Sequence, residues 1–266
     1  MNSIKHELKT GNMKIREANN FAPIQLDEMD QVKLMNRIDT KYWFHKSNLP
    51  VLLPQVYPFY FVLNINGEVA LPYATTYYDT DTNSMFTAHH NGKLNRYKIR
   101  RRSYVISGLS FLEVKFKNNK KRTIKKRIST LSSETEFSDI ENSFIQSTTP
   151  FSKEDLSPSL VNNFSRITLV SKNFNERCTI DFMLSFKSKK TTITLDNLVI
   201  VEIKSNGKPS ASPLAKTLRD QRIKASGFSK YCIGRTITEH SIKRNAFKHK
   251  VKMLENTLDT PGLYNF

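Results

Sequence analysis

The stretch from Leu94 to Ile128 constrains the fold most, because its charged residues recur at every second position. In an extended strand successive side chains point to opposite faces, so residues two apart share a face. Three such runs follow one another: Arg96, Lys98, Arg100 and Arg102, then Glu113, Lys115 and Lys117, then Lys125 and Arg127. We therefore predict three strands, each with its charges on one face.

The same stretch contains the turns and the apolar face of a meander. Ser107-Gly108 and Asn118-Asn119 are turn sequences that separate the three runs. The opposite face of the strands would carry Tyr97, Ile99, Leu112, Val114, Phe116, Ile124 and Ile128. We predict a three-stranded antiparallel sheet with one face on a core and one basic face.

A basic face of this density requires an anionic partner, because like charges that face one another on paired strands destabilise a sheet. A solvated surface would explain one such strand, whereas three adjacent strands favour a binding surface for a polyanion with several phosphates. The formal net charge of +18 agrees with a negatively charged partner. Charge alone leaves nucleic acid, an acidic membrane surface and a phosphate-rich small molecule open.

Length and cysteine content narrow the class of protein. A chain of 266 residues can bury the core of one large or two small domains. Cys178 and Cys232 are too few and too far apart for a disulfide framework, so we expect a cytoplasmic protein. No stretch approaches the roughly 20 apolar residues of a membrane span, and the N-terminus lacks the apolar segment of a secretion signal.

The rest of the chain repeats the alternation of charged and apolar positions. Further strands are predicted at 37–44, 59–65, 73–79, 163–171, 176–182, 191–195 and 198–204, the last two as a hairpin across Asp196-Asn197. Helices are predicted at 23–35, 84–90, 133–146, 212–225 and 242–258. Trp43 is expected in the core, on the face opposite Lys41. If the sheet closes into a barrel, the charged faces line its interior.

Seven motifs, in this order, resemble the catalytic domain of the VTC polyphosphate polymerases, within the CYTH or triphosphate tunnel metalloenzyme superfamily. The motifs are RIDTKYW at 37–43, KIRRRSY at 98–104, FLEVKFK at 111–117, TIKKRI at 123–128, ERCTID at 176–181, VIVEIK at 199–204 and GFSKY at 227–231. The resemblance implies an α+β fold with an antiparallel eight-stranded β-barrel and flanking helices. We expect a flexible segment at 1–21, the tunnel domain at 22–241 and a basic C-terminal helix and tail at 242–266.

The resemblance also implies a function: a metal-dependent phosphotransferase that uses ATP to extend inorganic polyphosphate, with Mn²⁺ or Mg²⁺ as cofactor. The phosphate-binding positions that it implies are Lys41, Arg100, Arg102, Lys115, Lys125, Arg127, Arg166, Arg177, Lys204 and Lys230. Arg100, Arg102 and Lys230 are also the catalytic candidates. Glu202 matches the metal-binding glutamate, and Glu113 and Asp39 are the other candidate metal ligands.

Two positions depart from the pattern of the superfamily. Triphosphatases and cyclases of this kind begin with alternating glutamates before a lysine, whereas this chain has Arg37, Asp39 and Lys41, which favours the VTC group. Gly227 stands where yeast-type sequences have a second lysine, and Lys224 is the nearest substitute.

Two rival functions stay open at this point: a tunnel triphosphatase, and a non-catalytic module that binds a polyanion. We expect no nucleic acid partner, because Tyr97, Tyr104, Phe111 and Phe116 are expected to lie mostly off the basic face, unlike the aromatic residues of RNA-binding sheets. The basic tail after about Ile242 leaves a contact with an acidic membrane or a partner protein open.

Overall fold

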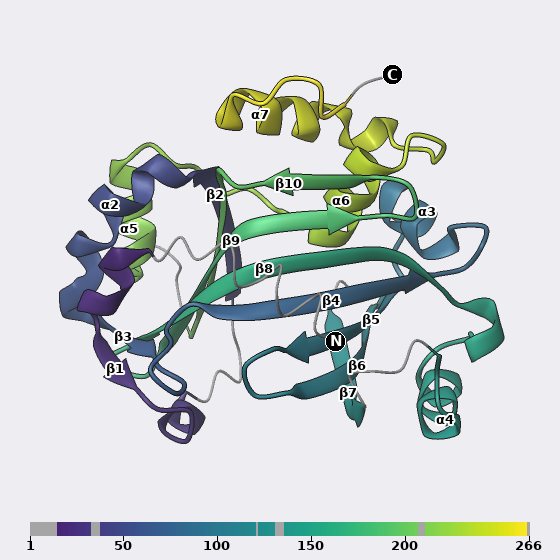
Figure 1. Ribbon diagram of the computed structural model, residues 1–266, viewed down its shortest axis with the longest axis horizontal. Coiled ribbons are helices and arrows are strands. Elements are labelled where there is room, and N and C mark those ends of the chain that lie inside the picture. The colour runs from purple at the N-terminus through teal and green to yellow at the C-terminus, as the bar shows by residue number, and fades with distance from the viewer. Residues whose placement is uncertain (1–14, 33–37, 121, 131–135, 207–210, 265–266) are drawn as a thin grey trace. The chain divides into compact units, whose positions relative to one another are not determined.

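The structure, a computed structural model, describes residues 15–32, 38–120, 122–130, 136–206 and 211–264 (Figure 1). The chain divides into two compact units. Unit 1 is Met1–Pro72, Phe164–Leu184 and Leu195–Phe228, and unit 2 is Tyr73–Asn163, Ser185–Thr194 and Ser229–Phe266. In the part of the chain that the structure describes, no helix is long and apolar enough to cross a membrane.

Unit 1 is a sheet whose strands pair in the order β2-β11-β9-β8. These strands are β2 (Ile38–His45), β11 (Leu198–Ser205) and the parts of β8 (Ser157–Ser171) and β9 (Glu176–Lys187) outside residues 157–163 and 185–187, which belong to unit 2. β3 (Tyr60–Leu63) pairs antiparallel with β8 and parallel with β1 (Ala22–Ile24). Helices α2 (Leu49–Leu52) and α5 (Pro213–Asp220) accompany the sheet, with 3₁₀ turns at Arg16–Asn20, Glu28–Gln31, Lys46–Asn48 and Pro54–Phe59.

The core of unit 1 takes every second residue of these strands. It includes Tyr42, Phe44, Ile167, Leu169, Cys178, Ile180, Val199, Val201 and Ile203, which pack against Leu214 and Leu218 of α5. Cys178 is a buried free thiol, as is Cys232. The alternation therefore leaves the other face of β2, β8, β9 and β11 to charged residues.

Unit 2 contains the predicted meander, which follows β4 (Leu71–Asp79) in the order β8-β4-β5-β6-β7. Its strands are β5 (Arg96–Tyr104), β6 (Leu109–Lys117) and β7 (Thr123–Thr130) (Figure 1). The helices are α3 (Ser84–His90), α4 (Asp139–Thr148), α6 (Lys230–Thr238) and α7 (Lys248–Leu258), with 3₁₀ turns at Lys153–Asp155 and Asn245–Phe247. Ile99, Leu112 and Val114 form the core of the meander with Tyr78 and Ile145.

The antiparallel α+β sheet with flanking helices confirms the predicted fold class, and eight strands form its main series. The series of pairings ends at β2 in unit 1 and at β7 in unit 2, and no ladder among the described residues closes it. The sheet is thus open in its hydrogen bonding, whereas the expected barrel was closed.

Two local predictions are wrong. Residues 23–35 do not form one helix, because Ala22–Ile24 is a strand and only Glu28–Gln31 forms a 3₁₀ turn; residues 33–35 lie outside the described part. The hairpin across Asp196-Asn197 is also absent, since β10 (Thr192–Leu195) and β11 both pair with β9. Two strands joined by a two-residue turn have the same sequence pattern whether they pair with each other or both pair with a third strand. Only the observed pairing distinguishes the two arrangements.

Gly234, inside α6, gives a first testable prediction. A Cβ atom added there would lie 2.5 Å from Cδ1 of Phe186 and 2.6 Å from Cδ2 of Leu160. Overpacking of this kind costs about 1–3 kcal/mol, which exceeds the roughly 1 kcal/mol that alanine gains over glycine in a helix. We expect Gly234→Ala to lower the free energy of unfolding in urea. Gly227→Ala is the control, because nothing lies within 4 Å of its added Cβ; equal effects of the two changes would contradict the packing.

Candidate functional site

Unit 1 carries a mixed charged face, made by Asp39, Lys41, Arg166, Arg177, Thr179, Asp181, Glu202 and Lys204. The register aligns these side chains across neighbouring strands, because Lys41 is opposite Glu202, Asp39 is opposite Lys204, and Lys204 is opposite Arg177. Residues directly opposite on paired strands share a face. The prediction that β2, β9 and β11 contribute charges to one face is confirmed by this register, with Arg37 outside the described residues.

The contacts on this face differ in tightness. Arg166 grips Asp181 through two hydrogen bonds, Nε to Oδ1 at 2.5 Å and a terminal nitrogen to Oδ2 at 2.8 Å. Glu202 lies 3.8 Å from the ammonium groups of both Lys41 and Lys204. Burial lowers the pKa of Lys204, although Glu202 acts in the opposite direction. An anion that approached Lys204 would favour its charged form.

Glu202 and Asp39 offer oxygen atoms of the type that Mg²⁺ and Mn²⁺ prefer. They lie on diagonal positions of the β2–β11 ladder. Thr179, opposite Glu202, has a buried hydroxyl with no hydrogen-bond partner among the described residues. No group of three acidic, histidine or cysteine residues in the described part could hold a metal ion. The donor set therefore fits Mg²⁺-type binding, in which one or two carboxylates hold the ion together with substrate phosphates.

Trp43 corrects one expectation. It lies two residues after Lys41 in β2 and is opposite Ile200, so it shares the charged face of unit 1 and does not join the core beneath it. The indole packs against Phe228 with ring centroids 6.2 Å apart. The period of two already required this placement.

Unit 2 carries a basic face over β5, β6 and β7. The register brings together eight basic side chains and one carboxylate: Arg96, Lys98, Arg100, Arg102, Lys115, Lys117, Lys125, Arg127 and Glu113. Lys98, Lys115 and Lys125 lie opposite one another across the three strands. The predicted meander and its basic face are thus confirmed, and the excess of like charge is the feature that a polyanion would offset.

Glu113 holds the centre of the basic face. Its side chain is fully buried, accepts hydrogen bonds from Arg100, with Nε at 2.7 Å, and pairs through its second oxygen with Lys125. Burial works to raise the pKa of Glu113, but the positive charges of Arg100, Arg102 and Lys125 outweigh it and hold that pKa well below its usual range. Glu113 therefore orients two cations, and its predicted role as a metal ligand stays a prediction.

Aromatic rings share the basic face, contrary to the expectation for Tyr104 and Phe111. Phe111 is directly opposite Arg102, and Tyr104 is opposite Tyr73 on the same face. Tyr97 and Phe116 do lie on the other face, where their rings stack at 4.6 Å. The period of two already places Tyr104 on the face of Arg102 and Phe111 on the face of Glu113. The β5–β6 register adds that Phe111 is directly opposite Arg102.

Lys230 is the first residue of α6, and Ser229 caps that helix by accepting a hydrogen bond from the backbone of Cys232. Lys98 donates a hydrogen bond from Nζ to Oγ of Ser229 at 3.1 Å. The N-terminus of α6 therefore lies at the edge of the basic face, and its dipole adds to the positive potential there. The sequence motif indicated Lys230, whereas the contact between Lys98 and Ser229 was not predicted.

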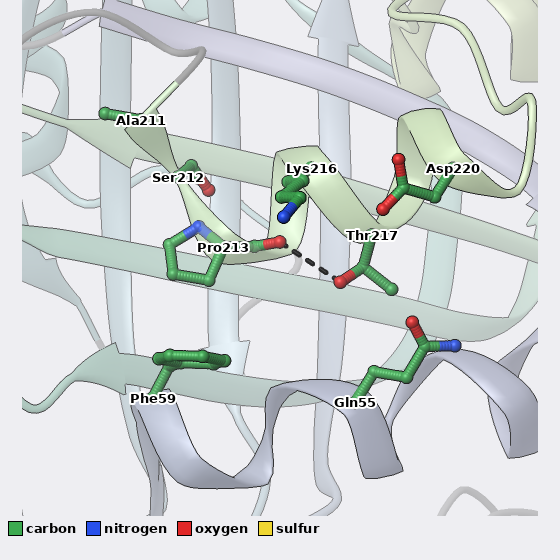
Figure 2. Close-up of a pocket in the computed structure, with 8 residues that line it drawn as sticks. All are labelled: Gln55, Phe59, Ala211, Ser212, Pro213, Lys216, Thr217 and Asp220. Atoms are coloured by element: carbon green, nitrogen blue, oxygen red, sulfur yellow. Dashed lines mark hydrogen bonds between the residues drawn. The ribbon is translucent and has the colours of Figure 1, made fainter.

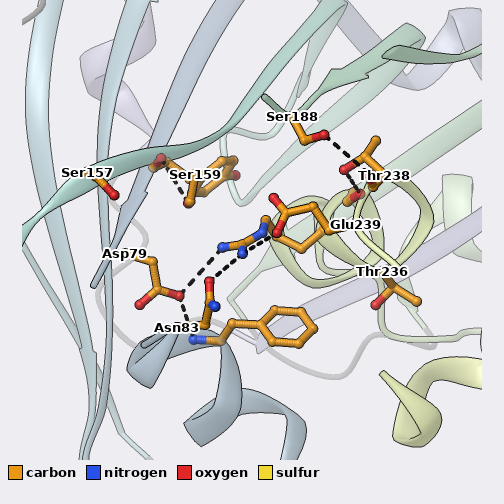
Figure 3. A network of polar contacts seen from close by, with 12 residues as sticks. Asp79, Asn83, Ser157, Ser159, Ser188, Thr236, Thr238 and Glu239 are labelled. Atoms are coloured by element: carbon orange, nitrogen blue, oxygen red, sulfur yellow. Dashed lines mark hydrogen bonds and ion pairs between the residues drawn. The ribbon is translucent and has the colours of Figure 1, made fainter. Parts of the chain in front are cut away.

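A buried polar network fixes α6 in unit 2. Tyr231 donates a hydrogen bond to Asp79 at 2.5 Å, and Arg235 donates to Asn83 and Glu239. Figure 3 shows Asp79, Asn83 and Glu239 converging on one point between α3 and α6. Asp79 also accepts two backbone hydrogen bonds from the start of α3. The network anchors the helix that carries Lys230.

A pocket of about 400 Å³ in unit 1 lies beside α5 (Figure 2). Its wall includes Gln55, Phe59, Ser212, Lys216, Thr217 and Asp220. Thr217 is bonded to the backbone oxygen of Pro213, and Lys216 is the one basic residue among those that line the pocket. The pocket thus lacks the cation density of the two charged faces.

Comparison with known proteins identifies one family, since the model of the VTC domain matches residues 36–238. No curated protein sequence matches the chain. Similar solved structures include a putative adenylate cyclase from Bacillus halodurans, with 10% identity, a TM-score of 0.48 and coverage of 73% of this chain and 96% of that one. A putative adenylyl cyclase from Hippeastrum, described as having a dominant triphosphatase activity, has 12% identity, a TM-score of 0.48 and coverage of 75% and 95%.

Proposed function

The chain belongs to the VTC domain family, and we propose that it is a polyphosphate polymerase, which transfers the γ-phosphate of ATP to the end of an inorganic polyphosphate chain. The observation that carries the proposal is the basic face of unit 2, where eight cations meet a single carboxylate. A row of phosphates supplies the negative charge that such a face requires.

In the proposed reaction, the bond between the γ-phosphorus and the β–γ bridging oxygen breaks, and a bond to the terminal oxygen of the polyphosphate chain forms. ADP leaves with the bridging oxygen. This chemistry needs alignment and charge neutralisation more than covalent help from protein. Arg100 and Arg102 would hold phosphate oxygens through their guanidinium forks. Lys230, at the positive end of α6, would contact the transferred phosphate.

On the mixed charged face of unit 1, taken by itself, we propose Lys41, Arg166, Arg177 and Lys204 as phosphate ligands. Glu202 and Asp39 would hold the divalent cation, with the hydroxyl of Thr179 nearby. When bound, Mn²⁺ or Mg²⁺ would supply Lewis acidity at the phosphate oxygens. The cytoplasmic location is part of the same proposal. The expected absence of a nucleic acid partner is not, because Tyr104 and Phe111 lie on the basic face.

Incubation of the pure protein with ATP and Mn²⁺ tests the proposal. We expect long-chain polyphosphate on a gel, with one ADP for each phosphate incorporated. If ADP and orthophosphate form without polymer, the protein is a triphosphatase and not a polymerase. No metal-dependent consumption of ATP would leave a passive polyanion-binding module.

Lys125 and Lys126 provide a matched pair for this assay. Both are exposed lysines of β7, and their side chains point to opposite faces of the strand, with Lys125 paired to Glu113 on the basic face. A charge-assisted contact is worth about 1.5–3 kcal/mol, so we expect Lys125→Ala to lower the rate of polymer synthesis about 10- to 100-fold. Lys126→Ala should stay within twofold of the wild type. Equal losses would show that net charge, and not the basic face, sets the rate.

A further inference from the structure

The basic face of unit 2 has two chemically different ends. Near one end, next to Arg96 and Lys117, Lys98 contacts Ser229, which caps the helix that begins at Lys230. At the other end, four residues further along β5, lie Arg102 and the aromatic rings beside it. About 13 Å of strand separates Lys98 from Arg102. The face therefore has a direction, from a helix N-terminus near one end to aromatic rings at the other.

We define the aromatic end as Tyr73, Tyr104, Phe111, Arg102 and Arg127. The rings of Tyr73 and Tyr104 lie 4.9 Å apart between centroids, and those of Tyr104 and Phe111 lie 5.8 Å apart. Cζ of Arg102 is 5.8 Å from the ring centroid of Tyr73, and Cζ of Arg127 lies over Phe111 at 4.5 Å. Each guanidinium group thus belongs both to the row of cations and to the aromatic cluster.

The aromatic end is not the core of the meander, because that core occupies the opposite face. Tyr104 and Phe111 are half-buried, and Arg127 is exposed on β7. Half-exposed rings and an exposed guanidinium group are the kinds of group on which a planar base stacks. An inorganic phosphate chain has no group that would stack on such rings, whereas a nucleotide has both a base and phosphates.

We propose that the aromatic end binds the nucleobase of the nucleotide that donates the phosphate, an inference that rests on the proposed function. The α-phosphate then lies against Arg102 and Arg127. The γ-phosphate points along the face toward Lys98, Ser229 and Lys230. Stacking distinguishes poorly among bases, so ATP and GTP bind with similar affinity.

The test compares the dissociation constants of ATP and inorganic tripolyphosphate, measured by calorimetry on the full chain. Tyr104→Leu and Phe111→Leu should each raise the dissociation constant of ATP about 5- to 100-fold. The dissociation constant of tripolyphosphate should stay within twofold of the wild-type value. Arg127→Lys keeps the charge but loses the stacking plane, so it should weaken the binding of ATP more than the binding of tripolyphosphate. This exposed position also serves if a leucine variant fails to fold.

Phe116→Leu is the matched control, because Phe116 belongs to the same strand as Phe111 but stacks with Tyr97 on the other face. It should leave the ratio of the two dissociation constants unchanged. Equal weakening of ATP and tripolyphosphate by the variants at the aromatic end, or unchanged ATP binding, would overturn the inference. The wild type could bind ATP more tightly than tripolyphosphate, with this preference lost in the variants, and yet make no polymer. That result would overturn the proposed polymerase activity but leave the nucleobase site standing.

Discussion

Replacement of Glu113 by alanine is expected to lower the free energy of unfolding by about 3–5 kcal/mol, the cost of removing one partner from a buried ion pair. Glu113 is fully buried and forms ion pairs with Arg100, which is 8% exposed, and with Lys125. Without the carboxylate, the buried guanidinium group of Arg100 loses its counter-charge, and Arg102 adds repulsion. Urea unfolding at pH 7 measures the change.

The control for Glu113 is an ion pair in water. Asp139 pairs with Lys153 at 3.3 Å, and its side chain is 97% exposed. Exposed pairs contribute about 1 kcal/mol or less, so Asp139→Ala should change the free energy of unfolding by no more than that. If Glu113→Ala costs as little as Asp139→Ala, the carboxylate does not hold the basic face together.

The difference in the free energy of unfolding between the wild type and Glu113→Gln should depend on pH in one direction. The pKa of Glu113 is lower in the folded protein than in the unfolded chain, so its contribution is complete above the unfolded pKa of about 4.3 and is lost as the pH falls. The stability gap between the wild type and Glu113→Gln should be constant from pH 7 to about 5. Below about pH 4.3 it should shrink by roughly 1.4 kcal/mol per pH unit. A gap that persists unchanged to pH 3 would contradict the lowered pKa.

The Arg100→Ala, Arg102→Ala double variant is expected to lose polyphosphate synthesis by about 10³-fold or more, since removal of a single transition-state donor costs about 10²–10³. Both residues are buried on the basic face, each with 8% of its surface exposed. Arg102 also donates to the hydroxyl of Thr75 at 3.3 Å, and Arg100 donates to Tyr77 at 3.4 Å. The measurement is polymer formed per minute from ATP.

Two further variants separate catalysis from folding. Arg100→Lys, Arg102→Lys keeps both charges beside Glu113 but loses the guanidinium forks, so it should fold and still lose most activity. Lys120→Ala, Arg122→Ala removes the same net charge from the exposed turn between β6 and β7 and should retain activity. Synthesis within tenfold of the wild type in the double alanine variant would reject Arg100 and Arg102 as substrate ligands.

The sequence allowed much of the candidate site to be predicted, because alternation along one strand is local. The positions of Lys98, Arg100 and Arg102 on one face of β5 follow from the period of two, and the structure confirms them. The same period of two places Trp43 on the face of Lys41, where the structure shows it, and not on the opposite face as expected. The resemblance to the VTC group added Lys230, which no periodicity marks.

Other features needed partners that are distant in the sequence. Ser229 meets Lys98 across 131 residues, and Phe111 lies beside Arg102 because of the β5–β6 register. The contacts of Glu113 with Arg100 and Lys125 likewise depend on how three strands align. A register shift of one residue would send each of these side chains to the other face.

The amino-acid sequence by itself determined which residues of each strand are charged together and which enter a core, since the backbone fixes that alternation within a few residues. Only the tertiary structure decided that the hydrogen-bonded series is open, that Glu113 contacts both Arg100 and Lys125, and that Tyr73, Arg102 and Phe111 meet at one end of the basic face. These features depend on strand order and register, which arise from the packing of segments far apart in the chain.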